Sequence, residues 1–256
     1  MTAPSWPERP GGGQSFVGCS GWSYRDWRGL SYPQHLPPSR WFAHYAATFR
    51  TVELNTTFYR LPSQHTVDGW REQAPPGFVY AAKVGSFGTH RKKLREPATW
   101  LGHHLERIGA LRDHLGPNLL QLPPRWKRNV DRLDAFLALA PAHIRWAVEL
   151  RDPSWLHEET YDVLRAHGAA LCIHDLLADH PWVRTTDWTY VRFHGPDAQR
   201  RPYHGRYTGR RLRPIADRLL GWIDEGCDVY AYFNNDQEAA AWADARWLAE
   251  ALDSVA

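Results

Sequence analysis

The sequence predicts a single-domain (β/α)₈ TIM barrel, an α/β fold in which eight parallel strands close into a cylinder. Eight short apolar runs typical of strands, helical patterns between them, and a length of 256 residues support this prediction, because barrels of this type have about 250 residues. Strands that alternate with helices lie parallel in one sheet, and eight such units favour closure. An open doubly wound sheet is the alternative, but no Gly-rich dinucleotide loop follows any predicted strand.

The predicted strands are short, and seven of the eight close on a group able to do chemistry. In a barrel, the carboxyl ends of all strands meet on one rim, where enzymes of this fold carry their active sites. The strands are predicted at Phe16–Ser20, Arg50–Asn55, Phe78–Lys83, Asn118–Gln121, Ile144–Glu149, Ala170–His174, Thr189–His194 and Val229–Asn234.

Helical periodicity fills the connections between these strands and follows the last one. Only residues 176–187 lack a helical pattern, because Ala-Asp-His-Pro interrupts it, and we expect a short turn there. The helices are predicted from Pro38 or Ser39 to Ala47 and at Gln64–Gln73, Ala98–His114, Val130–Leu139, Trp155–His167, Arg210–Glu225 and Gln237–Leu252.

Composition indicates one globular domain, over residues 15–253. Hydrophobic residues make up 43% and charged residues 23% of the chain, which is ordinary for such a domain. Residues 1–14 are rich in Pro and Gly and are predicted to be a disordered lead. No apolar run approaches the ~20 residues that span a bilayer, and the chain begins without a signal-like apolar stretch. Three cysteines without pairing or zinc-type spacing suit a reducing compartment. We therefore expect a cytoplasmic protein without membrane partners.

Alternation along the strands predicts which polar side chains share the barrel interior. Glu53 and Asn55 face opposite to Val52 and Leu54, and the same parity recurs on the other strands. We expect acids, bases and amides to gather in one water-accessible bowl. The inward set comprises Glu53, Asn55, Lys83, Gln121, Glu149, Arg151, His174, Arg192, His194, Tyr232 and Asn234.

The chemistry of this set favours an anionic ligand and proton transfer. Lys83, Arg151 and Arg192 outnumber the two carboxylates and are expected to hold a phosphate or carboxylate group. The catalytic candidates are Glu53 and Glu149 as acid and base, with His174 or His194 moving a proton. A satisfied salt-bridge network that fills the barrel top is the alternative for the five charged residues.

No cofactor is predicted, and a divalent metal is an alternative. Glu53, Glu149, His174, Asp175 and His194 are suitable ligand types. No HxH, HExxH or DxD pair provides ligand spacing, and the neighbouring cations would repel a metal ion.

Two basic loops lie on the predicted site face. Residues 89–95 have the sequence THRKKLR, and residues 200–213 have the sequence RRPYHGRYTGRRLR. Tyr203, His204 and Tyr207 stand among the cations, as aromatic residues do in proteins that bind single-stranded nucleic acid. The alternative is that both are solvated loops, which is the commoner role of a charge run.

Several motifs make the chain resemble the YecE-like family, a widespread domain-of-unknown-function family. They are GCSGWSYRDW, VELNTTFYRLP, an AAK strand followed by THRKKL, LLQLPP, VELRDPSW, YVRFHG, YHGRYT and YAYFNND, and they extend from Gly18 to Asp236. The resemblance implies a (β/α)₈ barrel related in shape to xylose-isomerase-like and endonuclease barrels. It also implicates Tyr24, Glu53, Asn55, Tyr59, Lys83, His90, Gln121, Glu149, Arg151, Arg192, His194, Asn234 and Asn235.

From these observations we expect a hydrolase-like enzyme that acts on an anionic substrate by acid–base chemistry at the barrel rim. The substrate is expected to bear phosphate, as a nucleotide or nucleic acid does. The alternatives are a metal-dependent phosphodiesterase or nuclease on the same barrel, and a non-catalytic nucleic-acid-binding barrel.

Overall fold

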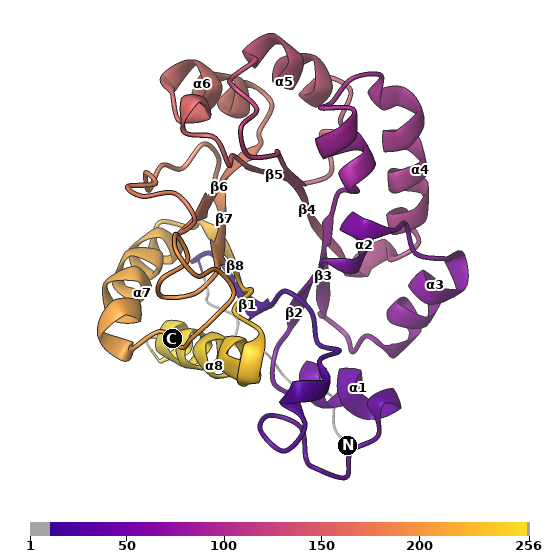
Figure 1. Cartoon of the computed structure of the whole chain (residues 1–256), viewed down its shortest axis with the longest axis vertical. Helices are drawn as coiled ribbons and strands as arrows, with labels where there is room; N and C mark the ends of the chain where they lie inside the picture. The colour runs from indigo at the N-terminus through magenta and orange to yellow at the C-terminus, as the bar shows by residue number, and fades with distance from the viewer. Residues whose placement is uncertain (1–10, 255–256) are drawn as a thin grey trace.

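Eight parallel strands form the centre of the molecule in a computed structural model that describes residues 11–254 (Figure 1). Hydrogen-bonded neighbours follow the order β1-β8-β7-β6-β5-β4-β3-β2, with every pair parallel. The (β/α)₈ prediction is confirmed, and each observed strand overlaps its prediction. The strands are β1 Ser15–Cys19, β2 Thr51–Leu54, β3 Val79–Lys83, β4 Leu115–Gln121, β5 Trp146–Glu149, β6 Ala170–His174, β7 Trp188–Phe193 and β8 Asp228–Phe233.

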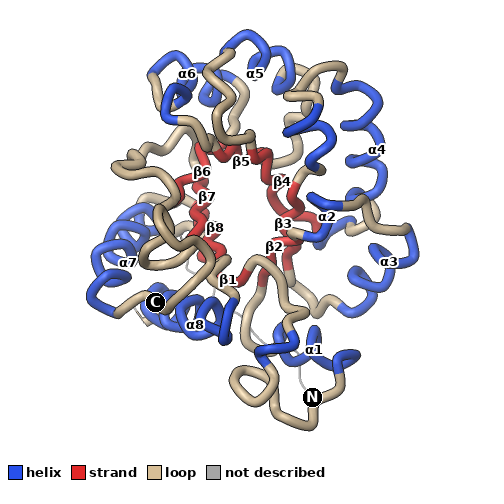
Figure 2. The backbone as a smooth tube through the Cα atoms, in the orientation of Figure 1, coloured by secondary structure: helices blue, strands red, loops and turns tan. Residues whose placement is uncertain are grey.

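The helices surround the strands as an outer ring (Figure 2). Local capping explains two of their starts, because Ser63 Oγ accepts from Thr66 N at 3.1 Å and Asn129 Oδ1 accepts from Arg132 N at 3.0 Å. The helices are α1 Trp41–Ala46, α2 Thr56–Tyr59, α3 Gln64–Gln73, α4 Pro97–Gly109, α5 Val130–Leu137, α6 Glu158–Ala166, α7 Gly209–Asp224 and α8 Ala240–Asp253.

Two helical details differ from the sequence prediction. The four-residue helix α2 was not predicted, because periodicity needs a longer window than a single turn. The predicted helix ending at His114 instead ends at Gly109, and a short 3₁₀ turn, Arg112–His114, leads into β4. No helix forms over residues 176–187, as expected.

The barrel interior is filled by side chains of one strand parity, which confirms the alternation argument. Large and small residues pack together there, so the cylinder is a core and not a pore. Below the strand ends this interior cluster contains Ala81, Leu119, Ala147, Ala170, Cys172, Trp188, Tyr190, Tyr230 and Tyr232. Two separate apolar clusters occupy the space between strands and helices.

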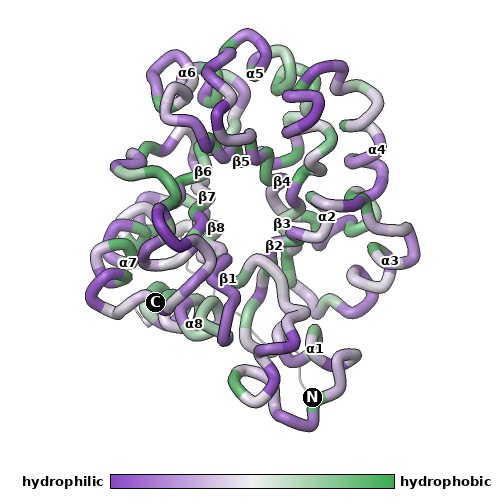
Figure 3. The backbone as a smooth tube through the Cα atoms, in the orientation of Figure 1, coloured by the Kyte–Doolittle hydropathy of each residue, from purple (hydrophilic) through white to green (hydrophobic). Residues whose placement is uncertain are grey.

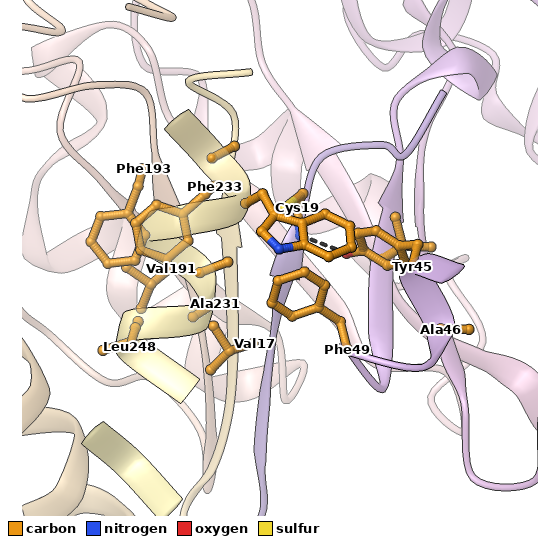
Figure 4. Close-up of a cluster of buried hydrophobic side chains, with 14 of the residues drawn as sticks. Val17, Cys19, Tyr45, Ala46, Phe49, Val191, Phe193, Ala231, Phe233 and Leu248 are labelled. Carbon is orange, nitrogen blue, oxygen red and sulfur yellow. Dashed lines mark hydrogen bonds between the residues drawn. The ribbon is translucent and has the colours of Figure 1, made fainter. Parts of the chain in front are cut away.

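Side chains close the barrel between β1 and β2, which are not neighbours in the hydrogen-bonded strand order. The Tyr45 hydroxyl accepts from Cys19 N at 2.8 Å and donates to Thr51 O at 2.9 Å (Figure 4). Arg50 Nε donates to Ser15 O at 2.6 Å near the other end of the same seam. At Gly18, a Cβ atom would lie 2.3 Å from Thr51 O, so glycine allows the two strands to approach this closely.

Residues 1–10 of the predicted disordered lead lie outside the described residues. Two later residues of that lead are attached to the barrel, since Gly13 N donates to Ile223 O and Gln14 N donates to Asp228 Oδ1, both at 2.8 Å. Within residues 11–254, no helix has the length and apolar character needed to span a membrane.

Candidate active site

A buried arginine organises the carboxyl-terminal end of the barrel, which we call the mouth. Arg192, near the end of β7, is 0% exposed. Its Nη2 donates to Glu53 Oε1 at 2.7 Å, and its Nη1 donates to Glu149 Oε2 at 2.5 Å. The two carboxylates come from β2 and β5, so one guanidinium joins three strands. The positive charge of Arg192 offsets the high cost of burying both anions.

Both glutamates are held in the ionised form. Burial alone would raise their pKa values, but nearby cations lower them by more. For Glu53 the Arg192 and Lys83 charges give a net pKa below the usual value. For Glu149 the Arg151 and Arg192 charges hold the pKa well below it. Both groups are therefore carboxylates at neutral pH, where they accept hydrogen bonds and stabilise positive charge.

Arg151 and His194 extend this cluster. Arg151 Nε donates to Glu149 Oε1, and its Nη2 lies 3.5 Å from His194 Nε2. Arg192 Nη1 is 3.2 Å from the same ring nitrogen. Because both guanidinium groups are donors, His194 Nε2 must be the acceptor and Nδ1 carries the proton.

Asp175 fixes the His194 ring in that tautomer. His194 Nδ1 donates to Asp175 Oδ1 at 2.9 Å, and the His194 backbone N–H lies 3.0 Å from both carboxylate oxygens. Burial lowers the pKa of His194 to about 4, partly opposed by the Asp175 hydrogen bond. The imidazole is consequently neutral, and its Nε2 lone pair accepts from the two arginines. We call Glu53, Glu149, Arg151, Asp175, Arg192 and His194 the ion cluster.

Lys83 lies beside the ion cluster without joining its hydrogen bonds. Its side chain ends β3 and is 7% exposed, and Nζ lies 4.2 Å from the centre of the Phe58 ring. Among residues 11–254, no hydrogen bond or ion pair engages this ammonium group. Burial, reinforced by Arg192, lowers the pKa of Lys83 to about 7 despite the two glutamates.

His90 and Gln121 continue the wall next to Lys83. The Phe58 and His90 ring centres are 5.0 Å apart, and Gln121 Nε2 lies 3.5 Å from His90 Nε2. Burial lowers the pKa of His90 to about 4, and the Lys83 charge adds to the shift. Gln121 Oε1 is buried and has no hydrogen-bond partner among the described residues. This wall therefore offers a free acceptor and a neutral imidazole.

The opposite side of the mouth is built from amides and a phenol. Asn55 Nδ2 donates to Asn234 Oδ1 at 3.3 Å, and Tyr24 OH donates to Ser20 O at 2.7 Å. Asn55 Oδ1 is a buried acceptor without a partner in residues 11–254. Hydroxyl or amide groups of a ligand would suit this side.

Four predicted site residues have other surroundings. His174 Nε2 donates to Leu150 O at 2.9 Å, and its Nδ1 accepts from Leu176 N at 3.2 Å. Both ring nitrogens are thus hydrogen-bonded to backbone groups. The Tyr232 hydroxyl pairs with Thr51 Oγ1 at 2.7 Å within the barrel core. Asn235 donates to Gly205 O and Asp244, and thus secures the loop after β7. Tyr59 is 82% exposed at the end of α2. These environments suit structural roles for the first three and surface contact for Tyr59.

The two basic loops differ in form. Residues 87–91 make a π-helical turn beside a cavity of about 600 Å³, which is also lined by Tyr59, Arg91 and Trp100. The loop of residues 195–208 is strongly hydrophilic (Figure 3), yet its Tyr207 hydroxyl is buried and donates to Asp175 Oδ2. Tyr207 therefore anchors the loop, contrary to a role as a free stacking ring.

The ion cluster does not fit a divalent metal. Within residues 11–254, no group of three or more His, Cys, Asp and Glu side chains is arranged to hold one. Glu53 and Glu149 both accept from Arg192, so a guanidinium stands where a shared cation would have to lie.

Sequence reasoning missed two residues that shape the site and did not predict the role of a third. Tyr190 OH donates to Glu53 Oε2 at 2.7 Å, and Phe58 covers Lys83. Asp175 was considered as a metal ligand because it follows His174, whereas in the structure it orients His194. Tyr190 shares the parity of Arg192, two residues earlier on β7, and this was the available indication.

The fold and the site together define a TIM-barrel protein whose strand ends hold a buried cluster of charged side chains. Residues 16–256 match the family described as Protein of unknown function DUF72, and the chain belongs to this family. The resemblance to YecE-like proteins is thereby confirmed.

Two curated proteins and one crystal structure illustrate what this chain is similar to. The UPF0759 protein YecE of Escherichia coli K12 is 30% identical over 141 residues, which are 55% of this chain and 49% of YecE, so the chain matches about half of that relative's length. The UPF0759 protein YunF of Bacillus subtilis is 25% identical, with 93% of this chain and 94% of YunF covered. A DUF72 family crystal structure from Thermotoga maritima has a TM-score of 0.85 at 30% identity, covering 94% of this chain and 99% of that one.

Proposed function

We propose that the protein is an enzyme that acts on a small anionic substrate by acid–base chemistry at the mouth of the barrel. The observation that carries this proposal is a difference in hydrogen bonding among Arg192, Lys83 and Arg151. Arg192 is fully buried and both of its Nη groups donate to carboxylates, whereas Lys83 and the partly exposed Arg151 keep N–H groups without protein partners in the described chain. Two such donors suit a phosphate or carboxylate ligand.

The roles of the residues follow from their protonation. Arg151 Nη1 has no partner in residues 11–254, and the side chain is 16% exposed, so it is the anion-binding donor. Arg192 positions Glu53 and Glu149, whose lowered pKa values keep them ionised at neutral pH, the form that a general base needs. Lys83, with a pKa of about 7, exchanges a proton near neutrality, where general acids and bases are most effective. The amides of Asn55, Asn234 and Gln121 orient the substrate.

Calorimetric titration of the purified protein with phosphate, sulfate and oxalate tests the anion-binding part. We expect binding that weakens about tenfold or more in Arg151→Met, because one charge-assisted hydrogen bond contributes about 1.5–3 kcal/mol. Arg165→Met is the matched control, since Arg165 pairs with Glu158 and Asp162 on the exposed face of α6. No detectable binding of any anion, or equal binding by Arg151→Met, would refute the proposal.

The catalytic part of the proposal is tested by measuring the turnover of candidate substrates. A screen of phosphate- and carboxylate-bearing metabolites with Glu149→Gln beside the parent protein is expected to give activity that the substitution lowers. An accepted substrate that Glu149→Gln converts at the parent rate would contradict a role for this carboxylate in the reaction.

A second candidate function, binding of single-stranded nucleic acid, is supported by the cavity beside the mouth. Tyr59 is 82% and Phe87 51% exposed on its lining, next to Arg91. Exposed rings among cations suit stacked bases and backbone phosphates. Fluorescence anisotropy with labelled oligonucleotides is expected to show salt-dependent binding that Tyr59→Ala and Phe87→Ala weaken. Binding that both variants retain would exclude this surface.

A further inference from the structure

The lysines of this chain are few, and one of them is unlike the others. The sequence has four lysines and 27 arginines. Lys92 and Lys93 are half-buried on the turn after β3, and the Lys127 side chain is 79% exposed. Lys83 alone is buried, at the end of a barrel strand. An amine at this position stands out because arginine supplies positive charge nearly everywhere else.

The ammonium group of Lys83 contacts an aromatic ring but has no hydrogen-bonded or ion-paired partner among the described residues. Its Nζ faces the Phe58 ring, and no carboxylate lies within ion-pair distance of it in the described chain. Arg192 and Arg151 occupy all four carboxylate oxygens of the nearby glutamates except the one that Tyr190 holds. A guanidinium would serve better for clamping an anion, because it binds two oxygens at once. An amine that loses its proton has a lone pair that can attack a carbonyl carbon, whereas a guanidinium stays protonated.

Charged groups from four elements set the state of this amine. Arg192 of β7 and Arg151 after β5 disfavour its protonation, while Glu53 of β2 and Glu149 of β5 favour it. His90 of the π-helical turn is neutral. Burial is the largest cause of the lowered pKa and acts in the same direction as the arginines, and the resulting pKa of about 7 leaves a large neutral fraction at physiological pH. Desolvation next to another cation is a known way to activate a lysine nucleophile.

We propose that Lys83 Nζ forms an imine with the carbonyl group of a small anionic aldehyde or ketone, a substrate class that rests on the anionic ligand proposed above. The neutral amine attacks the carbonyl carbon, and the C=O electron pair moves to oxygen. A proton passes from nitrogen to that oxygen to give a carbinolamine. The C–O bond then breaks with uptake of one proton, water leaves, and the nitrogen lone pair completes a protonated C=N bond.

Two features next to Lys83 support this step. Gln121 Oε1, on a side chain 5% exposed, has no partner in residues 11–254 and can accept the carbinolamine hydroxyl. The position of Phe58 is also fixed, because Thr57 Oγ1 in the preceding position donates to Leu54 O at 2.7 Å and to Lys83 O at 2.6 Å. The ring covers one side of the buried amine, and this desolvation favours the neutral form that attacks a carbonyl.

Reductive trapping tests the inference on the full-length protein. Glyoxylate, an aldehyde with a carboxylate, is added with sodium cyanoborohydride at pH 7, and the modified peptides are quantified by mass spectrometry. We expect Lys83 to be labelled about ten times faster or more than Lys92, Lys93 and Lys127, since an amine of pKa ~10.4 is about one part in 2,500 neutral at pH 7. Lys83→Arg should abolish this fast label, and Lys92→Arg should leave it unchanged.

The outcomes separate this inference from the proposed function. Labelling of Lys83 no faster than that of the other three lysines overturns the imine, and this readout needs no variant. If phosphate or oxalate binds through Arg151 but glyoxylate does not label Lys83, the imine fails and the anionic site stands. If uncharged acetaldehyde labels Lys83 as fast as glyoxylate does, the anionic substrate class is overturned while the reactive amine remains.

Discussion

Arg192 Nη2 and Glu53 Oε1 lie 2.7 Å apart although 139 positions separate the two residues in the chain. Their strands, β7 and β2, are not neighbours in the sheet, since β6, β5, β4 and β3 stand between them in the hydrogen-bonded order. Both side chains are 0% exposed. The contact therefore crosses the barrel and forms only when the cylinder closes.

Replacing the central cation should destabilise the fold strongly. In Arg192→Met, Glu53 and Glu149 lose their shared partner while they stay buried, and breaking a buried ion pair in this way costs about 3–5 kcal/mol. Urea denaturation at pH 7 measures the loss. Arg165→Met, at an exposed pair, should change the free energy of unfolding by less than about 1 kcal/mol. A loss below that level in Arg192→Met would mean that water already reaches the cluster.

Acid should weaken the protein through the same carboxylates. Their folded-state pKa values are lower than the unfolded values, so their stabilising contribution is complete above the unfolded pKa of about 4.3 and disappears as the pH falls through the folded pKa. The free energy of unfolding, measured by urea denaturation between pH 7 and pH 3, should therefore fall with pH. Glu149→Gln should flatten that dependence. An equally steep curve in the variant would assign the acid sensitivity to other groups.

Lys83 should destabilise the fold as the pH falls, over a higher pH range than the carboxylates do. Its folded-state pKa is about 7, below the unfolded value, so the unfolded chain binds more protons between pH 7 and about 10.4. Stability rises with pH over that interval, and the full penalty for burying the amine is present below pH 7. Lys83→Met should consequently raise the free energy of unfolding by a few kcal/mol at pH 6. This magnitude follows because each unit of pKa shift corresponds to about 1.4 kcal/mol.

The advantage of Lys83→Met should shrink by pH 10, where the parent amine is neutral in both states. Urea denaturation at pH 6 and pH 10 supplies the comparison, with Lys127→Met as the exposed control. If Lys83→Met is less stable than the parent at pH 6, the ammonium is stabilised by its neighbours and the proposed neutral amine is wrong.

The seam between β1 and β2 should depend on one hydroxyl group. In Tyr45→Phe, the Cys19 N–H and the Thr51 carbonyl both lose a buried partner. Unsatisfied buried groups cost about 1–3 kcal/mol each, and we expect a loss of that order for the pair by thermal or urea denaturation. Tyr59→Phe, at an exposed position, is the control. An unchanged melting temperature in Tyr45→Phe would show that water replaces the hydroxyl.

Strand alternation predicted the faces of the barrel well but not the partners across it. Glu53, Glu149 and Arg192 were expected to share one bowl, and they do. That Arg192 would neutralise both carboxylates depends on barrel closure and strand stagger, which no local pattern contains. Lys83 was expected to bind an anion together with the arginines, and this stays a prediction. That its ammonium group joins none of the ion pairs depends on the same pairing across the barrel.

Strand alternation also does not determine how deep in the barrel a side chain lies. Tyr232 is level with Arg192 in the strand register, yet its ring lies 5.1 Å from that of Tyr190 and its hydroxyl reaches Thr51. His174 was placed on the correct strand end, but neighbouring backbone groups take both nitrogens. The role of Tyr207 as a loop anchor depends on the path of the loop. The sequence shows only that this loop is polar and contains aromatic residues.

The pairing through Arg192 also links the two halves of the polypeptide. Strands β1–β4 contribute Glu53, whereas β5–β8 contribute Glu149 and the arginine that neutralises both. A separately folded half barrel would lack either the cation or one of its counterions. The ion pairs at the mouth therefore form only in the complete cylinder, which disfavours stable half-barrel intermediates. The charged side chains of the mouth reach their final positions only in the fully folded chain.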